Sequence, residues 1–188
     1  MRKLVLGAVT EWRMNSGASL DDDGNWRKIR SIVLERDGYT CHFCGFSSPS
    51  YMEVHHLRGR FDDNSPENLS TLCPFCHSCH HIGFSGLKER GVLLELDSKF
   101  RVKQARLNRT LLDSLADKGT TEVFDRMLSS LPVQENHGAE GLVMLANLII
   151  QKESEGEDVS PPGNLVYFPD YRKYDISGFL MRGGKRCS

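Results

Sequence analysis

The 188-residue sequence lacks an excess of one charge and lacks a long apolar run. It has 24 Lys and Arg against 25 Asp and Glu, which leaves a formal net charge of -1. Because proteins that bind nucleic acid often carry a strong basic excess, any such binding here depends on a local patch. The longest apolar stretch, residues 141–150, is far shorter than the roughly 20 residues that span a bilayer. Residues 4–9 are too short for the apolar core of a secretory signal. We therefore expect a soluble, cytoplasmic protein without membrane insertion.

Cysteine is scarce outside one stretch of the chain. Of the six cysteines, five lie between Cys41 and Cys79, and the sixth, Cys187, stands alone near the C-terminus. In a reducing cytoplasm, paired C-x-x-C units indicate metal binding rather than disulfides. The first unit is Cys41-His-Phe-Cys44 and the second is Cys73-Pro-Phe-Cys76.

Two C-x-x-C turns offer four thiolates to one ion, and zinc prefers four soft ligands in a tetrahedron. Cys41, Cys44, Cys73 and Cys76 are therefore predicted to hold a structural Zn²⁺, with Gly45 easing the backbone out of the first turn. An alternative set includes Cys79 in place of Cys73 or Cys76, because Cys76-His-Ser-Cys79 has the same spacing.

Histidines gather in the same stretch. Of the seven histidines, five are His55, His56, His77, His80 and His81. Neighbouring residues of a strand point to opposite faces, so His55 and His56 can serve two purposes. His77 and His81 have the i, i+4 spacing that shares one helix face, so they can chelate one ion.

The expected elements follow from periodicity and from turn residues. We expect a helix from Asn25 to the stop at Gly38, a short strand within residues 4–10 and another within 51–57, and a helix within 70–82. The second half is expected to hold a buried strand at 92–96, helices at 109–117, 122–131 and 139–152, a loop at 153–164 and a last strand at 165–168.

In order and spacing, these motifs resemble the HNH, or ββα-metal, endonuclease family over about one third of the chain. The motifs are Arg36-Asp37-Gly38, Cys41-x-x-Cys44, Val54-His55-His56-Leu57, Asn68-Leu69 and Leu72-Cys73-x-x-Cys76-His77. The resemblance implies hydrolysis of phosphodiester bonds in DNA, with an activated water and a divalent cation.

The resemblance also assigns roles to residues. His56 would be the general base and Asn68 would orient its ring. His55, His77 and His81 would bind a second divalent metal, Mg²⁺, Mn²⁺, Ni²⁺ or Zn²⁺. Where the family usually has Asp, this chain has His55, which favours softer ions. The plainer alternatives are a packing histidine at His56 and a turn residue at Asn68.

A second, narrower resemblance is to the IcmJ/DotN family, HNH-like components of type IVB secretion coupling complexes. It rests on Cys41-His-Phe-Cys-Gly-Phe46, Tyr51-x-Glu53-Val54, Asn68-Leu-x-Thr71 and the additional Cys79. This resemblance implies a non-catalytic scaffold whose partners are a coupling ATPase or other secretion-system subunits. The chain departs from that family because it keeps His55, His56 and His77.

We therefore expect an α+β protein with three parts: an N-terminal extension (1–24), a zinc-bound HNH-like domain (25–90) and a mainly helical C-terminal region (91–188). An active metal-dependent nuclease and a scaffold both remain open. Basic residues near the site would form a DNA-backbone face or merely a solvated surface. They are Arg27, Lys28, Arg30, Arg36, Arg58 and Arg60.

Overall fold

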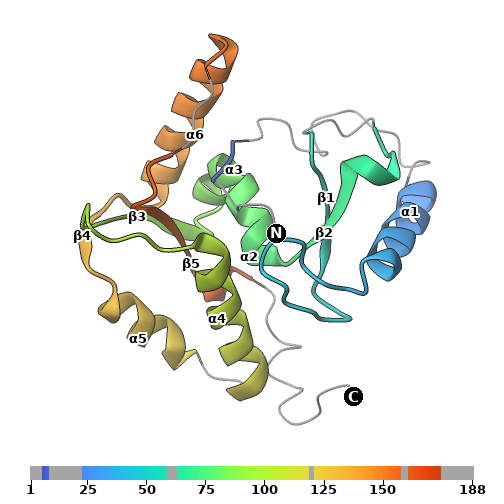
Figure 1. Cartoon of the computed structure of the whole chain (residues 1–188), viewed down its shortest axis with the longest axis horizontal. Coiled ribbons are helices and arrows are strands. Elements are labelled where there is room, and N and C mark those ends of the chain that lie inside the picture. Colours follow the sequence, from blue (N-terminus) through green and yellow to red (C-terminus); the bar gives the residue numbers. More distant parts are fainter. Residues whose placement is uncertain (1–5, 9–22, 59–62, 119–120, 158–160, 175–188) are drawn as a thin grey trace.

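The computed structural model describes residues 6–8, 23–58, 63–118, 121–157 and 161–174, and it has the expected α+β fold. Most of the N-terminal extension, most of the strand expected within residues 4–10, and Arg60 lie outside the described residues. Two groups of elements lie side by side (Figure 1). The first group is α1 (Asp23–Arg36), β1 (Glu53–His56), the 3-10 turn η3 (Pro66–Asn68), β2 (Leu69–Leu72), α2 (Pro74–His80) and α3 (Ile82–Leu87). The second group is β3 (Gly91–Leu96), α4 (Gln104–Lys118), α5 (Glu122–Ser130), β4 (Val133–Asn136), α6 (Gly138–Ser154), β5 (Leu165–Pro169) and the 3-10 turn η4 (Tyr171–Lys173).

A two-stranded ribbon and a following helix form the centre of the first group. β1 and β2 pair antiparallel with His55 opposite Ser70, and α2 begins two residues after β2. Helix α1 packs against both strands and ends before Gly38, whose φ of 57° lies in the left-handed region that favours glycine. The helix predicted from Asn25 to Gly38 and the strand predicted within 51–57 are therefore confirmed.

Arg36 and Asp37 fasten the end of α1 to β2. The guanidinium of Arg36 donates to the carbonyl oxygens of Pro66 (2.7 Å) and Leu69 (2.8 Å), and it also pairs with Asp37. The Asp37 carboxylate accepts the backbone N–H of Thr71 at 3.0 Å. Arg36 is therefore engaged by the fold itself, which removes it from the set of basic residues expected to meet a DNA backbone.

The second group is built on an antiparallel sheet with strand order β4-β3-β5. Helix α6 packs against β3 and against α3, while α4 reaches α2 of the first group. The helix α3, the strand β4 and the two 3-10 turns were not predicted. The helix expected to begin at Arg109 begins five residues earlier, at Gln104.

One continuous cluster of buried side chains runs through both groups. Leu72 from β2, Leu94 from β3, Leu111 from α4 and Leu142 from α6 are all fully buried members of it. The boundary expected between residues 90 and 91 thus separates two groups of elements that share one core.

Close packing of α3 on α6 depends on glycine. A Cβ atom on Gly86 would lie 2.6 Å from the carbonyl oxygen of Ala139 and 2.7 Å from a methyl group of Val143.

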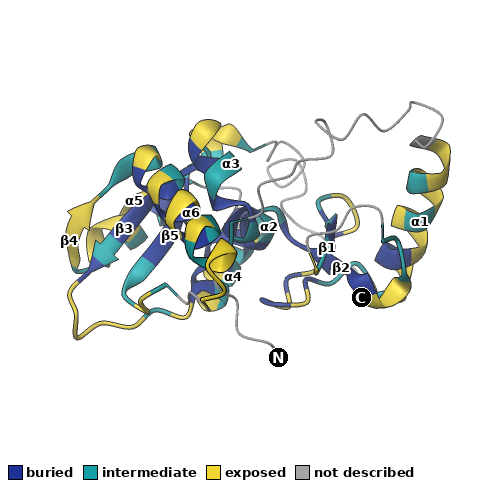
Figure 2. Ribbon diagram, turned by 90° about the horizontal axis from the view of Figure 1, so that it is seen from above, coloured by how far each residue is buried: buried dark blue, intermediate teal, exposed yellow. Residues whose placement is uncertain are grey.

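Figure 2 shows that α6 buries one face and exposes the other, where Met144 and Leu148 are 72% and 47% exposed. Among the described helices, none combines the length and apolar character needed to cross a membrane.

Candidate metal centres

The two C-x-x-C turns meet inside the first group. The Sγ atoms of Cys41, Cys44, Cys73 and Cys76 lie within 4.8 Å of one another, and all four residues are buried. The first turn is closed by a 2.9 Å hydrogen bond from the N–H of Gly45 to the carbonyl of Cys41, with Gly45 at a φ of 70°. Four soft donors converging from two turns fit a single structural metal ion.

The fifth cysteine of the stretch lies outside this cluster. Burial raises the pKa of the Cys79 thiol to about 12, so it stays protonated at neutral pH. Cys79 accepts a hydrogen bond from the side-chain amide of Asn108 at 3.5 Å, and Cys76 accepts one from the same amide at 3.4 Å. The structure thus favours Cys73 and Cys76, rather than Cys79, as metal ligands. Cys79 has a packing role.

Asn108 connects the cysteine cluster to the second group of elements. Its Oδ1 accepts from Gln104 at 3.0 Å, and Gln104 in turn donates to the carbonyl of Tyr167 on β5 and accepts the N–H of the same residue. Gln104 and Asn108 are both buried, so this chain of hydrogen bonds replaces water as their partner. The sequence offered one signal, two amides at i, i+4 on a helix with an apolar face, which was not recognised.

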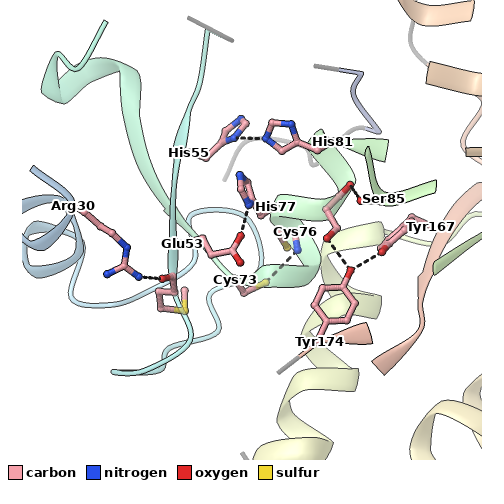
Figure 3. Close-up of polar contacts among 12 residues, drawn as sticks. Arg30, Glu53, His55, Cys73, Cys76, His77, His81, Ser85, Tyr167 and Tyr174 are labelled. Carbon is pink, nitrogen blue, oxygen red and sulfur yellow. Dashed lines mark hydrogen bonds and ion pairs between the residues drawn. The ribbon is translucent and has the colours of Figure 1, made fainter. Parts of the chain in front are cut away.

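A second cluster consists of three histidines. Ring nitrogens of His55, His77 and His81 lie within 4.8 Å of one another. His55 comes from β1, His77 from α2, and His81 from the junction between α2 and α3, where its ψ of 48° ends the first helix. His77 and His81 therefore converge, but not as neighbours on one continuous helix. Figure 3 shows the three rings turned toward one another, with Nε2 of His81 3.2 Å from Nδ1 of His55.

The electrostatics of the histidine cluster suit metal binding. Burial, reinforced by the neighbouring histidines, lowers the pKa of His55 far below its usual value and lowers that of His81 to about 3. Both rings are therefore neutral at pH 7, and the neutral imidazole is the form that binds a metal. A metal ion held by three imidazole nitrogens keeps coordination positions open for water or substrate.

Glu53 holds the third ring of this cluster in place. Its carboxylate contacts Nδ1 of His77 (Figure 3), which leaves Nε2 to face His55 and His81. Burial tends to raise the pKa of Glu53, but His77, Arg90 and Arg30 outweigh it, and the net pKa is lowered. A carboxylate that orients a histidine in this way is the usual partner of a metal-binding imidazole. Glu53 stands in one of the sequence motifs, Tyr51-x-Glu53-Val54, but sequence reasoning gave it no role at the metal site.

His56 points to the other face of β1, as expected. Its ring stacks on Trp26 of α1 with centroids 5.3 Å apart and an interplanar angle of 15°. Its Nε2 lies 3.0 Å from Oδ1 of Asn64, so this nitrogen donates its proton to the amide oxygen. Trp26 and Asn64 were missed by sequence reasoning, since neither belongs to a recognisable motif.

Asn68, expected to orient His56, is fully buried at the end of η3. Its side chain accepts the N–H of Arg58 at 2.9 Å and donates to the carbonyl of Asp63 at 2.8 Å. These bonds tie together the two ends of the loop that follows His56. Asn68 is thus placed to act on the ring through the loop backbone, and Asn64 supplies the side-chain contact.

The other histidines take different positions. His80 is packed between Phe43 and His55, with ring centroids 5.0 Å and 4.8 Å away. His42 is exposed. His137 lies with Glu95 and Glu135 at a third group of potential ligands. Its two ring nitrogens face different carboxylates, Nε2 that of Glu95 at 3.2 Å and Nδ1 that of Glu135 at 3.4 Å.

No known protein-family model matches this chain. Two curated proteins are similar to parts of it. The type 4 apparatus protein DotN of Legionella pneumophila is 33% identical over 83 residues, which cover 44% of this chain and 38% of DotN. The Zorya protein ZorE of Escherichia coli is 38% identical over 56 residues, which cover 28% of this chain and 15% of ZorE. The chain therefore matches well under half the length of either relative.

Proposed function

We propose that this protein is a metal-dependent nuclease of the HNH type, which hydrolyses phosphodiester bonds of DNA in the cytoplasm. In this proposal a structural Zn²⁺ occupies the four-cysteine cluster, and a second divalent cation occupies the histidine cluster. The observation that carries the proposal is the meeting of His55, His77 and His81 within reach of one ion, on the strand that also carries His56.

The chain supplies the groups that this chemistry needs. A divalent cation at the histidine cluster would supply positive charge to the scissile phosphate and to the leaving oxygen. Nε2 of His56 lies against Oδ1 of Asn64, and an imidazole held in this way is the kind of group that serves as a general base for water. Trp26 and Asn64 fix the plane of that ring, and Glu53 fixes the ring of His77.

The experiment offers supercoiled plasmid and single-stranded circular DNA to the full chain with Mg²⁺, Mn²⁺, Ni²⁺ or Zn²⁺. We expect cleavage, with a preference for softer ions because all three ligands are imidazoles. His56→Ala should reduce the rate by about 100-fold or more, as for loss of a general base. His81→Ala should instead weaken binding of the second metal, measured by calorimetry.

The matched control is His42→Ala, which removes an exposed histidine between two of the cysteines and should keep full activity. Metal content per chain confirms that each variant still holds its structural ion. Absence of cleavage with every metal and both DNA forms, or equal activity of wild type and His56→Ala, would reject the nuclease proposal.

The similarity to DotN favours a second candidate, a scaffold subunit of a type IV secretion or conjugation coupling complex. In this function the cysteine cluster stabilises the fold, and the partner is a coupling ATPase or another subunit of the machine. The test is co-purification of the chain with the coupling ATPase from the same genome. Stable binding by a chain that is inactive on DNA would support the scaffold, and no binding would reject it.

A further inference from the structure

A cavity of about 350 Å³ lies on one side of Glu53, the carboxylate that contacts His77 of the histidine cluster. Elements of both groups line it: α1, β1, α2, α4, η4 and the segment before β3. Glu53 belongs to the cavity wall and also contacts His77, so one side chain connects the cavity to the candidate metal site. In Figure 3, Glu53 lies between Arg30 and His77. If a substrate binds at the histidines, an adjoining part of the same substrate would therefore lie beside the cavity.

The charge of the cavity wall is mainly positive. Arg30, Arg90 and Lys173 line it together with a single carboxylate, that of Glu53, which is already engaged by His77. Arg30 is held by a 2.7 Å hydrogen bond to the carbonyl of Met52, and Lys173 pairs with the exposed Glu89 at 3.1 Å. The wall thus offers positive charge to an anion that enters the cavity.

Arg90 is the cation best prepared for an anionic ligand. Its guanidinium lies 5.2 Å from the ring centroid of Phe84 and 5.7 Å from that of Tyr174, so two aromatic faces hold it. Glu53 is the carboxylate of the same wall, and it contacts His77. A guanidinium held by aromatic rings fits a phosphate, which it can bind with two hydrogen bonds.

The remaining wall is aromatic and apolar. Tyr51, Phe75 and Tyr174 line the cavity, and the rings of Phe75 and Tyr174 meet edge to face with centroids 4.9 Å apart. Cations beside aromatic rings are the combination with which proteins hold unpaired nucleotides, since phosphates meet the cations and bases stack on the rings. In an intact duplex the bases are stacked inside and cannot enter such a cavity without being flipped out.

We propose that this cavity binds one nucleotide of a single-stranded nucleic acid, adjacent to the phosphate that occupies the histidine site. Arg90 and Lys173 contact the backbone phosphate, and Tyr51 contacts the base. The inference rests on the proposed nuclease function and deepens it, because it makes single strands, rather than duplex DNA, the preferred substrate.

The test measures binding rather than cleavage. Full-length, metal-loaded protein carrying His56→Ala is titrated into a fluorescein-labelled 12-nucleotide thymidine strand, a 12-base-pair duplex and a 12-residue polyglutamate peptide. Fluorescence anisotropy is recorded at several salt concentrations without added divalent metal. We expect the single strand to bind about tenfold more tightly than the duplex, with weaker binding of the peptide, because only the strand offers both phosphates and free bases.

Variants of the cavity decide the assignment. Arg90→Gln combined with Lys173→Gln should weaken strand binding by about tenfold or more. The slope of log affinity against log salt should also fall by about 0.7 for each phosphate that the protein no longer neutralises. Arg90→Lys keeps the charge and should retain most of the affinity. The matched control replaces two exposed arginines away from the cavity, Arg106→Gln with Arg126→Gln, and should leave binding unchanged.

If the double variant fails to fold, Lys173→Glu and Tyr51→Ala test the same wall, and each should weaken strand binding at least about fivefold. Equal affinity for strand and duplex, or unchanged binding in the cavity variants, overturns the proposal, as does equally tight binding of the peptide at this wall. Strand binding that depends on Arg90 in a chain that cleaves nothing would uphold the cavity and reject the nuclease. Cleavage at the same rate in wild type and in the cavity variants would support the nuclease and reject the cavity as a binding site.

Discussion

The two groups of elements are stabilised in different ways. The first group, residues 23–87, has short strands and helices, and its buried centre contains cysteines and histidines. The second group, residues 91–174, has longer helices over a three-stranded sheet, and leucines dominate its interior. Short elements bury too little apolar surface to be stable alone, so a small domain needs a metal or a neighbour. Although the two groups share one core, we expect metal removal to affect the first group most and mutations among the buried leucines to affect the second group most.

The largest effect is expected from removal of the cysteine-bound ion, by chelation or by Cys76→Ala. Binding of a structural zinc contributes about 10–16 kcal/mol in small metal-dependent domains. This is as large as the whole free energy of unfolding of a typical protein, roughly 5–15 kcal/mol. Hydrogen exchange should lose protection in β1, β2 and α2, while β3, β5 and α4 keep more of theirs. Cys79→Ala is the matched control and should retain the metal. Uniform loss of protection would mean that the two groups unfold together.

The reciprocal change is Leu111→Ala, which empties a fully buried position of α4. Large-to-small replacements in a core cost about 2–5 kcal/mol. We expect a lower free energy of unfolding in denaturant titrations, with metal content per chain unchanged. Leu128→Ala, at a position 37% exposed, should change stability little. Loss of the metal in Leu111→Ala would contradict the division between the two halves.

Asn108→Leu tests the connection between the halves. The replacement removes the hydrogen bonds to Cys76 and Cys79 and takes from Gln104 one of the two acceptors of its side-chain amide, leaving one buried N–H unpaired. An unsatisfied buried polar group costs about 1–3 kcal/mol. We expect a lower thermal midpoint and earlier loss of metal on heating. Asn147→Leu, on the exposed face of α6, is the control with the same change of side chain and should have no such effect.

A smaller effect is expected at the glycine contact between α3 and α6. Gly86→Ala places a methyl group against the backbone of Ala139, and overpacking of this kind costs about 1–3 kcal/mol. Because α3 begins directly after His81, the shift should also weaken metal binding at the histidines. Gly24→Ala meets no atom within 4 Å and should be neutral or slightly stabilising. Equal metal affinity in both variants would show that α3 does not position His81.

Residue spacing was enough to predict much of the first group. The two C-x-x-C turns, the adjacent His55 and His56, and the glycine stop after α1 are local patterns, and the structure has them where expected. Contacts between distant residues could not be predicted, because no local rule brings Trp26 to His56 or Glu53 to His77. The strand β4 was missed because all four of its residues are exposed, so its sequence has no apolar alternation.

The buried amide of Asn108 has a consequence for the lifetime of the metal site. A sulfur that accepts amide hydrogens has less electron density to offer to an oxidant or to an incoming proton. Cys76 is hydrogen-bonded in this way by a residue 32 positions further along the chain, and that residue is connected to β5 through Gln104. The rate at which the ion exchanges with solution should therefore depend on the intactness of a sheet that contributes none of the four cysteines.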